Sequence, residues 1–279
     1  MSTIFIVGSS SGIGKATAKL FAEKGWTVIA TMRSPEKETE LTSYENVFIY
    51  PLDVTKPEVI ENTVSEVLGK YDVDVLFNNA GYGMKSRFED MTEEAMQRSL
   101  NTNLLGMIRV TQKFIPYFKA KKSGMILTTT SLAGEMGLVL DGIYAADKWA
   151  VTGVCEMLYH ELYPFGIQVK TIVPGVVKTG FKMEMSEMPG FDDLIKNQTE
   201  MLMPDMDDLE LPEEVAQDIY NAVTDKDSNR MCYVTGKITK KLYQKRQELG
   251  DEAFRKYIRT CLMKKYSIKS VGIVTRQLI

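Results

Sequence analysis

The chain has 279 residues, of which 44% are hydrophobic and 25% are charged, and its formal net charge is −3 at pH 7. This composition is typical of a globular protein with enough apolar residues for one sizeable core. No run of 18 apolar residues predicts a membrane span. No charged leader precedes a cleavage site, because a strand-like run starts at Thr3. We therefore expect a cytoplasmic protein.

The residue types argue against several other classes. The three cysteines, Cys155, Cys232 and Cys261, are widely spaced and form no CxxC pattern. Such spacing argues against a disulfide framework and against a zinc site, so we expect reduced thiols and no metal. The negative net charge and the lack of a recognisable binding motif argue against nucleic acid as a partner.

Apolar segments of strand length alternate with longer helical segments along most of the chain. We expect strands near residues 3–8, 26–31, 46–50, 73–77, 124–130, 167–173 and 231–235, with the longest helices at 92–119 and 143–163. This alternation predicts an α/β fold, in which right-handed crossovers place helices on both faces of a parallel sheet. We expect a doubly wound sheet of about seven strands in one domain, residues 1–236, and a helical extension, residues 237–279.

A glycine-rich turn joins the first expected strand to the first expected helix. It reads Gly8-Ser-Ser-Ser-Gly-Ile-Gly14 and follows the apolar run Ile4–Val7. Glycine permits a tight turn and close backbone approach, and the amides at a helix start can bind a pyrophosphate. The alternative is an ordinary turn that needs positive φ. A strand, a glycine turn and a helix in this order predict a dinucleotide site in a Rossmann-type fold.

The end of the second expected strand bears on the choice of dinucleotide. NAD sites place an acidic residue there for the ribose 2′-hydroxyl, whereas the 2′-phosphate of NADP requires positive charge. Here no carboxylate occurs before Glu36, Arg33 is well placed for the phosphate, and Ser10 could also donate to it. The alternative is that Arg33 is a solvated loop residue. We expect NADP(H) to be preferred over NAD(H).

Tyr144 and Lys148 are four residues apart in the expected helix 143–163, so they share one helix face. A nearby ammonium stabilises phenolate, and it should therefore lower the pKa of the phenol from its ordinary value of about 10. Such a phenol is an acid/base group for alcohol and carbonyl chemistry. This spacing is also common on solvated helix faces, so the pair gains weight only from the motifs around it.

Several motifs follow one another in the order typical of the short-chain dehydrogenase/reductase family. They are Gly8 to Gly14, Leu52-Asp-Val54, Asn78-Asn-Ala-Gly81, Asn101-Thr-Asn-Leu-Leu-Gly106, Ser131, Tyr144 with Lys148, and Pro174-Gly175. Through these motifs residues 3–236 resemble that family, and the chain is similar to its hydroxysteroid and retinol dehydrogenase branch.

The resemblance implies a catalytic set of Asn103, Ser131, Tyr144 and Lys148. Ser131 stands at the end of the expected strand 124–130, where ligands bind in open α/β sheets, so it can donate to the substrate oxygen. The three threonines before it, residues 128–130, compete for that role. Asn103 matches the asparagine that interrupts a long helix and holds a water in a proton relay to the lysine.

Asn101 is the alternative candidate for this relay position. It falls inside the same otherwise apolar helix, two residues before Asn103.

The resemblance also implies which residues hold the dinucleotide. Asp53 should meet the adenine amino group, Lys148 should bond the nicotinamide ribose, and Val177 and Thr179 should contact the nicotinamide carboxamide. Asn79 could instead only tie strands together. The full predicted set is Gly8, Ser10, Ser11, Gly12, Ile13, Gly14, Arg33, Asp53, Val54, Asn79, Ala80, Gly81, Tyr144, Lys148, Pro174, Gly175, Val177 and Thr179.

Three positions depart from the family pattern or invite a second role. Val7 replaces a common threonine. Asp147 replaces a common serine, and we expect it to point into a helix interface or into solvent; near the site and ionised, it would oppose phenolate formation at Tyr144. His160, the only histidine, lies about 160° round the helix from Tyr144 and should face away.

The segments after residue 177 bear on the substrate and on partners. By position, residues 178–212 should form a lid over the substrate, and their many methionines, Met206 among them, suit a bulky apolar alcohol or ketone or simply pack a helix. From Gly236 onward the chain has 12 Lys and Arg but three Asp and Glu, beside an apolar helical stripe. Such a helix can bind an anionic membrane or an acidic partner, or dock on its own chain or a sister subunit.

Together these features predict an NADP(H)-dependent oxidoreductase that interconverts a carbonyl and a secondary alcohol by hydride transfer. Tyr144 would exchange the proton, and Ser131 would hydrogen-bond the same oxygen. The alternative is a sensor or scaffold protein that keeps the fold and binds the nucleotide without catalysis. Members of the family commonly associate through the two long helices, so we expect a homodimer or homotetramer.

Overall fold

A seven-stranded parallel sheet forms the centre of the protein in the computed structural model, which describes residues 2–205 and 209–264. Its strand order is β3-β2-β1-β4-β6-β7-β9, and every neighbouring pair is parallel. Each expected strand corresponds to one of these, so the predicted doubly wound sheet is confirmed. The strands are β1 (Thr3–Val7), β2 (Thr27–Met32), β3 (Val47–Pro51), β4 (Val75–Asn78), β6 (Gly124–Thr129), β7 (Ile167–Val173) and β9 (Cys232–Val234).

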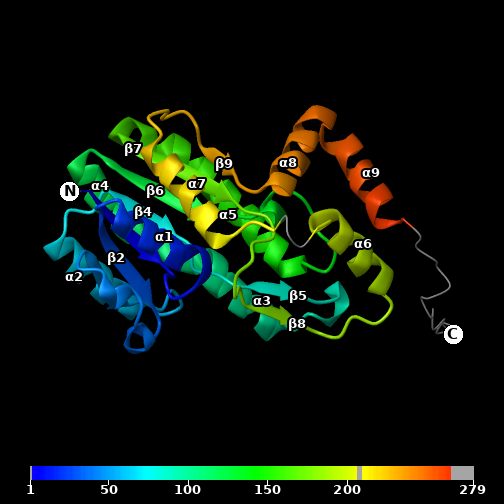
Figure 1. The fold of residues 1–279 in the computed structure, drawn as a ribbon, viewed down its shortest axis with the longest axis horizontal. Coiled ribbons are helices and arrows are strands. Elements are labelled where there is room, and N and C mark those ends of the chain that lie inside the picture. Colours follow the sequence, from blue (N-terminus) through cyan, green and yellow to red (C-terminus); the bar gives the residue numbers. More distant parts are fainter. Residues whose placement is uncertain (1, 206–208, 265–279) are drawn as a thin grey trace.

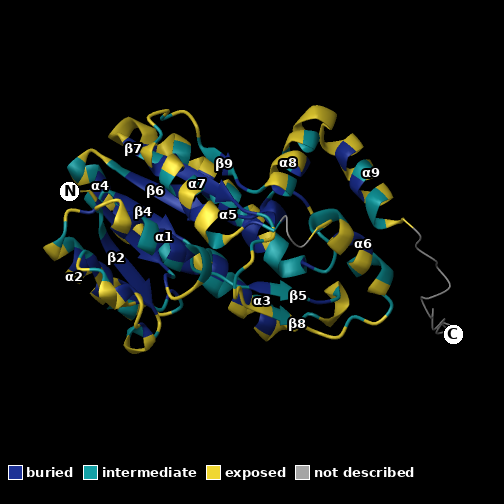
Figure 2. Cartoon of the chain, viewed as in Figure 1, coloured by how far each residue is buried: buried dark blue, intermediate teal, exposed yellow. Residues whose placement is uncertain are grey.

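Helices cover both faces of this sheet (Figure 1). On one face lie α1 (Gly12–Glu23) and α7 (Pro212–Thr224). On the other lie α2 (Pro57–Lys70), α4 (Gly106–Lys121) and α5 (Gly142–Leu162). The sheet is the most deeply buried layer, while the helices are buried only along the side that faces it (Figure 2).

The expected helix 92–119 consists of three successive segments. It begins as α3 (Glu93–Leu100), passes through a π-helical turn at Asn101–Leu105, and continues as α4. A π-helical turn widens the helix by one residue and is frequent at functional sites. The interruption implied by the asparagines therefore exists as a change of winding rather than a break.

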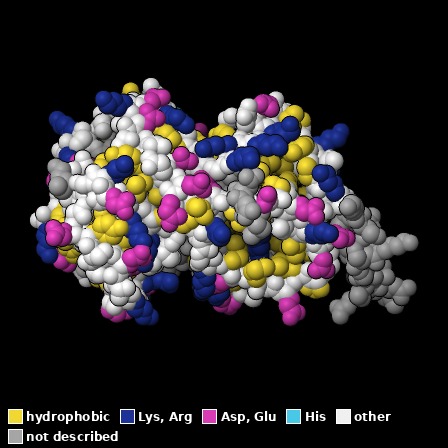
Figure 3. Space-filling model, in the orientation of Figure 1, with side chains coloured by type: hydrophobic (Ala, Val, Ile, Leu, Met, Phe, Trp, Pro, Cys, Tyr) yellow, Lys and Arg dark blue, Asp and Glu magenta, His cyan; other side chains and the backbone are white. Residues whose placement is uncertain are grey.

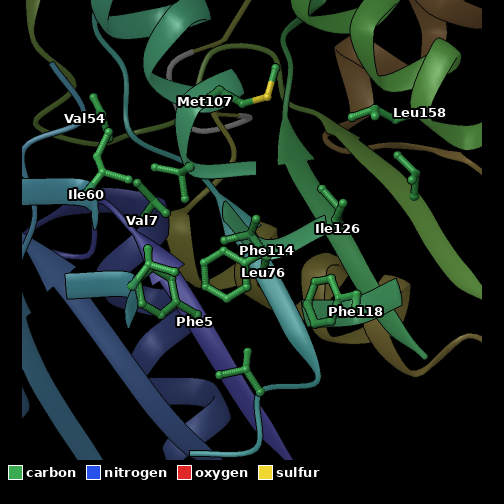
Figure 4. Packing of buried hydrophobic residues seen from close by; sticks show 14 of the residues in the cluster. Phe5, Val7, Val54, Ile60, Leu76, Met107, Phe114, Phe118, Ile126 and Leu158 are labelled. Carbon is green, nitrogen blue, oxygen red and sulfur yellow. The ribbon is translucent and has the colours of Figure 1, made fainter. Parts of the chain in front are cut away.

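Alternate side chains of each strand serve the two halves of the core, because successive residues point to opposite faces. Phe5 packs with Phe114 of α4, ring edge to ring face at 5.0 Å between centroids (Figure 4). Its neighbours Ile4 and Ile6 point the other way, into the cluster that includes Phe21 of α1.

A smaller unit covers the carboxyl end of the sheet. Two short strands, β5 (Gly83–Lys85) and β8 (Met183–Met185), pair in parallel, and neither was predicted from the sequence. The same end of the molecule carries α6 (Asp192–Leu202), α8 (Lys237–Leu249) and α9 (Asp251–Leu262), which are drawn at the right in Figure 1, where α9 packs with both α6 and α8.

The C-terminal helices dock on their own chain. Their side chains Leu242, Phe254 and Ile258 form a third apolar cluster with Leu132 and Met136, which follow β6. This packing agrees with one of the alternatives for the basic extension, namely that it docks on its own chain. The predicted lid residue Met206 and residues 265–279 of the extension lie outside the described residues. Among the helices that the structure describes, none combines the length and apolar character needed to span a bilayer.

Replacement of Phe114 by alanine tests the core. The side chain is fully buried, so we expect F114A to lower the free energy of unfolding by about 3–5 kcal/mol. Denaturant unfolding followed by circular dichroism measures this loss. Phe88 is 81% exposed, and F88A should change the same quantity by no more than about 0.5 kcal/mol. Equal losses would show that Phe114 does not anchor the core.

Candidate active site

The predicted site residues lie at the carboxyl edge of the sheet. Gly8 follows β1, Asn79 follows β4, Ser131 follows β6 and Pro174 follows β7. The chain runs from β1 outward to β3 on one side and from β4 outward to β9 on the other. The point between β1 and β4 is thus the topological switch point, where open α/β sheets bind their ligands.

The glycine turn is packed too tightly for side chains. Gly8 and Gly12 have φ of +84° and +54°, and a Cβ on Gly14 would lie 2.1 Å from the Gly8 carbonyl oxygen. A Cβ on Gly8 would lie 2.8 Å from the Cα of Ala80. The first turn of α1 has no acidic residue, and its N-cap Ser11 makes no side-chain cap bond. The turn therefore suits an anionic phosphate group, which the backbone can approach closely.

Two neighbouring segments close round this turn. Thr179 comes within 3.3 Å of the position that a Cβ on Gly12 would take. The Asn79 side chain donates to the Gly8 carbonyl at 2.9 Å and accepts from the Thr129 hydroxyl at 3.1 Å. Asn79 thus ties β1, β4 and β6 together, which was the alternative role, and its adenosine contact stays a prediction.

The charges at the end of β2 divide into two groups. Glu38 is buried and pairs with Lys15 of α1 at 3.0 Å, so its charge is balanced within the protein. Arg33 is exposed and lies near Asp53. Burial works to raise the pKa of Asp53, but hydrogen bonds from Thr55 and the charges of Lys56 and Arg33 lower it overall. An arginine and a carboxylate thus border the place where the adenosine is expected.

Tyr144, Ser131 and Lys148 converge in front of β6. The Lys148 ammonium donates to the Thr129 carbonyl at 2.9 Å and lies 5.8 Å from the centre of the Tyr144 ring, on the same side of α5. The Ser131 hydroxyl lies close enough to the Tyr144 phenol to influence its pKa, and it accepts from the Ala133 amide at 3.1 Å.

The competing threonines are directed elsewhere. Thr129 bonds to Asn79, and the Thr130 hydroxyl donates to the Ile172 carbonyl at 3.0 Å. Thr128 is buried, and its hydroxyl has no hydrogen-bond partner among the described residues. The serine, and not a threonine, therefore lies beside the phenol.

Burial controls the protonation of the pair and corrects one expectation. It raises the pKa of Tyr144 to about 12, although the nearby Ser131 hydroxyl acts to lower it, and Asp141 and Asp147 raise it further. Burial also lowers the pKa of Lys148 to about 8. The expected lowering of the Tyr144 pKa by the ammonium is wrong for the protein alone, because desolvation disfavours phenolate and ammonium alike.

Asn103 lies in the π-helical turn and is bound on all sides. Its side-chain oxygen accepts from the Tyr82 amide at 3.0 Å, and its nitrogen donates to the Tyr82 carbonyl at 3.0 Å and to Asp147 at 2.9 Å. Asn101 instead accepts from Arg109 at 2.7 Å. Of the two asparagines, Asn103 is the one that faces the catalytic helix.

A small cavity lies between Asn103 and Lys148. Asn78 and Thr128 also line it, and each of them carries a buried oxygen without a hydrogen-bond partner among the described residues. Its volume is about 10 Å³, close to the space that one water molecule needs. The geometry therefore has the polar groups and the room for a water beside the lysine.

Sequence patterns did not single out three neighbours of Tyr144. Phe181 packs against its ring at 6.2 Å between centroids, and Asp141 at the start of α5 lies 3.5 Å from Lys85 of β5. Phe181 closely follows the Pro174-Gly175 motif, so its place near the site could have been inferred from the sequence. No sequence pattern pointed to Asp141 or Lys85. His160 is exposed and turned away from the site, as predicted.

The rim of the site is apolar. Among its side chains Phe181, Met183 and Met185 are 45%, 38% and 63% exposed. In Figure 3 hydrophobic side chains border a hollow near β5 and α6. This surface is suited to an apolar ligand.

A doubly wound sheet, a glycine turn after β1 that suits a phosphate group, and a Tyr–Lys pair in front of β6 are together typical of nucleotide-dependent α/β oxidoreductases. Residues 2–190 match the short chain dehydrogenase family, and the chain belongs to that family. The protein is therefore an NAD(P)-dependent dehydrogenase or reductase.

Three known proteins illustrate the similarity. Human retinol dehydrogenase 8 is 34% identical over 205 residues, which cover 68% of this chain and 65% of that protein. A short-chain dehydrogenase from Streptomyces avermitilis superposes with a TM-score of 0.83 at 26% identity, over 93% of this chain and 96% of that one. An alcohol dehydrogenase from Thermococcus sibiricus, complexed with 5-hydroxy-NADP, superposes with a TM-score of 0.70 at 28% identity, over 85% and 96%.

Replacement of Gly14 by alanine tests the glycine turn. The new Cβ would meet the Gly8 carbonyl, so we expect a stability loss of about 1–3 kcal/mol and a loss of NADPH binding. Thermal unfolding and NADPH fluorescence titration measure the two effects. Gly69 in α2 has open space around it, and G69A should leave binding unchanged. Unaltered NADPH affinity in G14A would contradict the assigned phosphate site.

Proposed function

We propose that the protein is an NADP(H)-dependent oxidoreductase that interconverts a carbonyl and a secondary alcohol, with Tyr144 as its acid/base. The observation that carries this proposal is the meeting of the Tyr144 phenol and the Ser131 hydroxyl, with the Lys148 ammonium on the same helix face. Two hydroxyl groups that point to one place can both bond a single substrate oxygen.

The bound nicotinamide supplies or accepts the hydride at the substrate carbon. In reduction Tyr144 gives its proton to the substrate oxygen, on which negative charge develops. Ser131 accepts from the Ala133 amide, so its own hydrogen is available for the same oxygen. Lys148 uses one of its three donor hydrogens on Thr129, and the others can reach the nicotinamide ribose.

We assign the remaining proton movement to Asn103 and the cavity beside it. A water there would connect the ammonium of Lys148 to the polar groups round Asn103. Such a path would return a proton to Tyr144 after each reduction.

The preference for NADP(H) is supported by charge. Lys15 is engaged by Glu38 and Glu40, which leaves Arg33 and Lys56 as exposed cations near Asp53, and of these two Arg33 directly follows β2. A guanidinium there can bind a 2′-phosphate through two parallel hydrogen bonds. The similar Thermococcus alcohol dehydrogenase was crystallised with an NADP derivative, which is consistent with this choice.

For the substrate we propose a bulky apolar alcohol or ketone. Residues 178–212, with β8 and α6, would form its lid, while residues 1–236 form the catalytic domain and residues 237–279 an extension packed on it. The exposed apolar side chains at the rim favour such a ligand, and the similarity to retinol dehydrogenase 8 agrees with it. We further infer a cytoplasmic homodimer or homotetramer.

A sensor or scaffold protein with the same fold is the second candidate. Such a protein needs a nucleotide site but no acid/base group. The half-buried Tyr144 beside Ser131 and the buried Lys148 favours the enzyme, since a binding protein has no need of a desolvated phenol and ammonium at one place.

Replacement of Tyr144 by phenylalanine tests the enzymatic role. A general acid contributes about 10²–10⁴-fold to the rate, so Y144F should lose that factor in kcat while it keeps NADPH binding. NADPH absorbance across a panel of ketones, steroids, retinoids and small diketones provides the assay. The exposed Tyr163 offers a matched control, and Y163F should retain the wild-type rate. Full activity of Y144F, or no turnover of any panel member, would refute the proposal.

Replacement of Arg33 by alanine tests the cofactor preference. Loss of a charge-assisted bond to the 2′-phosphate should raise the Kd for NADPH by roughly 10- to 100-fold and leave that for NADH almost unchanged. Fluorescence titration with both nucleotides measures the difference. Lys37 is an exposed cation four residues away, and K37A controls for net charge. Equal losses for NADPH and NADH in R33A would contradict the assignment.

A further inference from the structure

Asp147 lies between Tyr144 and Lys148 on α5 and is completely buried. Its carboxyl group sits where α5 meets α3 and the π-helical turn. Of the two expected directions, a helix interface or solvent, the structure therefore shows the helix interface. An ionised carboxylate without water is costly unless other groups compensate for the lost hydration.

The hydrogen bonds of Asp147 identify it as an acceptor. Its Oδ2 receives the Ser99 hydroxyl at 2.5 Å and the Asn103 side-chain nitrogen at 2.9 Å. The orientation of the Asn103 amide is fixed independently, because its oxygen accepts from the Tyr82 amide and its nitrogen donates to the Tyr82 carbonyl. Two donors that converge on one oxygen are characteristic of the ionised form.

The second oxygen of Asp147 has no hydrogen-bond partner among the described residues. Burial raises the pKa of this carboxyl, although Ser99, Asn103 and Lys148 act in the opposite direction. Two hydrogen bonds thus stabilise the negative charge at Oδ2, whereas Oδ1 receives no hydrogen bond from the described residues.

The charged and titratable groups round Asp147 come from several elements. On α5 these are Tyr144 and Lys148, with Asp141 one turn before Tyr144. On α3, Arg98 points out to Glu184 at 3.5 Å. In the loop after β4, Tyr82 contributes a phenol whose pKa is raised, chiefly by burial and also by Glu184 and Asp147.

None of these groups other than Lys148 brings a positive charge to the Asp147 carboxylate. Asp141 has a cation of its own, Lys85, at 3.5 Å, whereas the Lys148 ammonium is directed to the Thr129 carbonyl. The negative field of Asp147 therefore reaches Tyr144, one helical turn away.

We propose that Asp147 is a positioning residue of this active site: its carboxylate holds the Asn103 amide, and its charge adds to the effect of burial in keeping Tyr144 protonated, so that the site is set for carbonyl reduction. The proposal rests on the proposed function.

The chemistry of the two directions explains the bias. In reduction the carbonyl carbon gains a hydride from the reduced nicotinamide, and the oxygen gains the proton of Tyr144. The products are the secondary alcohol, the oxidised nicotinamide and a phenolate that recovers its proton from water. Oxidation needs the phenolate at the start. A negative charge one turn from the phenol disfavours that form and so favours reduction over a wider pH range.

The positioning role follows from the position of Asn103 between two elements. Its amide joins the backbone of Tyr82 to α5, and the bond to Asp147 is the link on the α5 side. Loss of the Asp147 acceptor would leave the Ser99 hydroxyl and the Asn103 nitrogen without this hydrogen-bond partner. Asn103 lines the cavity beside Lys148, so the change would reach the wall of that cavity.

Replacement of Asp147 by asparagine removes the charge and keeps an oxygen for both donors. We expect the pH profile of oxidation in D147N, in which kcat rises as Tyr144 ionises, to move to lower pH by about one unit. This size follows from a unit charge roughly one helical turn away in a protein interior. The alkaline fall of the reduction rate should move down by the same amount. The plateau rates should change by less than about threefold.

Two further variants separate charge from position. D147A removes both the charge and the acceptor, so it should show the same shift and also a plateau lower by about tenfold or more. Glu156 is an exposed carboxylate on the same helix, and E156Q should leave both the profile and the plateau unchanged. An unmoved profile in D147N would overturn the charge role, and a full plateau in D147A would overturn the positioning role.

A readout without turnover keeps this test separate from that of the proposed function. Tyrosinate absorbance, taken as the difference between each protein and its Tyr144→Phe counterpart, follows the same ionisation. The Tyr144 step should occur at lower pH in D147N than in the wild type. If no substrate is turned over but this step moves, the proposed function fails and the charge effect of Asp147 stands; an unmoved step refutes that effect.

Unfolding gives a second readout independent of activity. The pKa of Asp147 is higher in the folded than in the unfolded chain, so the folded state binds more protons as pH rises above the ordinary value of 3.8. Stability due to this group therefore falls with rising pH. The wild type should lose stability relative to D147N between about pH 4 and pH 7. A constant difference between the two proteins over that range would contradict a buried carboxylate that ionises.

Discussion

The burial of a phenol and an ammonium beside each other is the constraint on which the site depends. Burial disfavours both charged forms, and it brings the pKa of Tyr144 and the pKa of Lys148 to about 12 and about 8. The Tyr144 phenol therefore begins as an acid, which suits the delivery of a proton. The lysine lies near the point where it can hold or release one at neutral to mildly alkaline pH. The surrounding residues act by shifting this balance.

The π-helical turn connects that balance to the rest of the fold. The extra residue in the turn carries Asn103 out of regular α-helical register and against the backbone of Tyr82. Gly81 permits this approach, because a Cβ there would lie 3.1 Å from the Asn103 side-chain oxygen. The Asn103 amide thus connects the loop after β4 and the long helix to α5, and the Ser99 hydroxyl adds a second bond from the long helix to Asp147. Asn103 and Lys148 line the same cavity.

Local patterns were enough to predict the sheet, the glycine turn and the positions of Ser131, Tyr144 and Lys148, because strand ends and helix faces repeat regularly. They could not predict the pairing of β5 with β8, since each strand has three residues and 100 positions separate them. Nor could they predict the direction of the Tyr144 pKa shift. Desolvation depends on side chains such as Phe181 that reach the site from distant segments. The same holds for Asp147, for which a helix interface and solvent were both left open and whose partners on α3 and the π turn were not predicted.

The C-terminal extension is also connected to the active site by contacts between segments that are distant in the sequence. Two adjacent side chains of α6 make the link: Asn197 donates to the carbonyls of Leu262 and Lys264 at the end of α9, and Gln198 bonds both the amide and the carbonyl of Val139. Val139 lies in the loop between Ser131 and Tyr144. Because the apolar stripe of the extension is used against Leu132 and Met136, many of its Lys and Arg side chains face solvent, and those over α8 are visible in Figure 3. The described part of the extension therefore stabilises the loop between Ser131 and Tyr144.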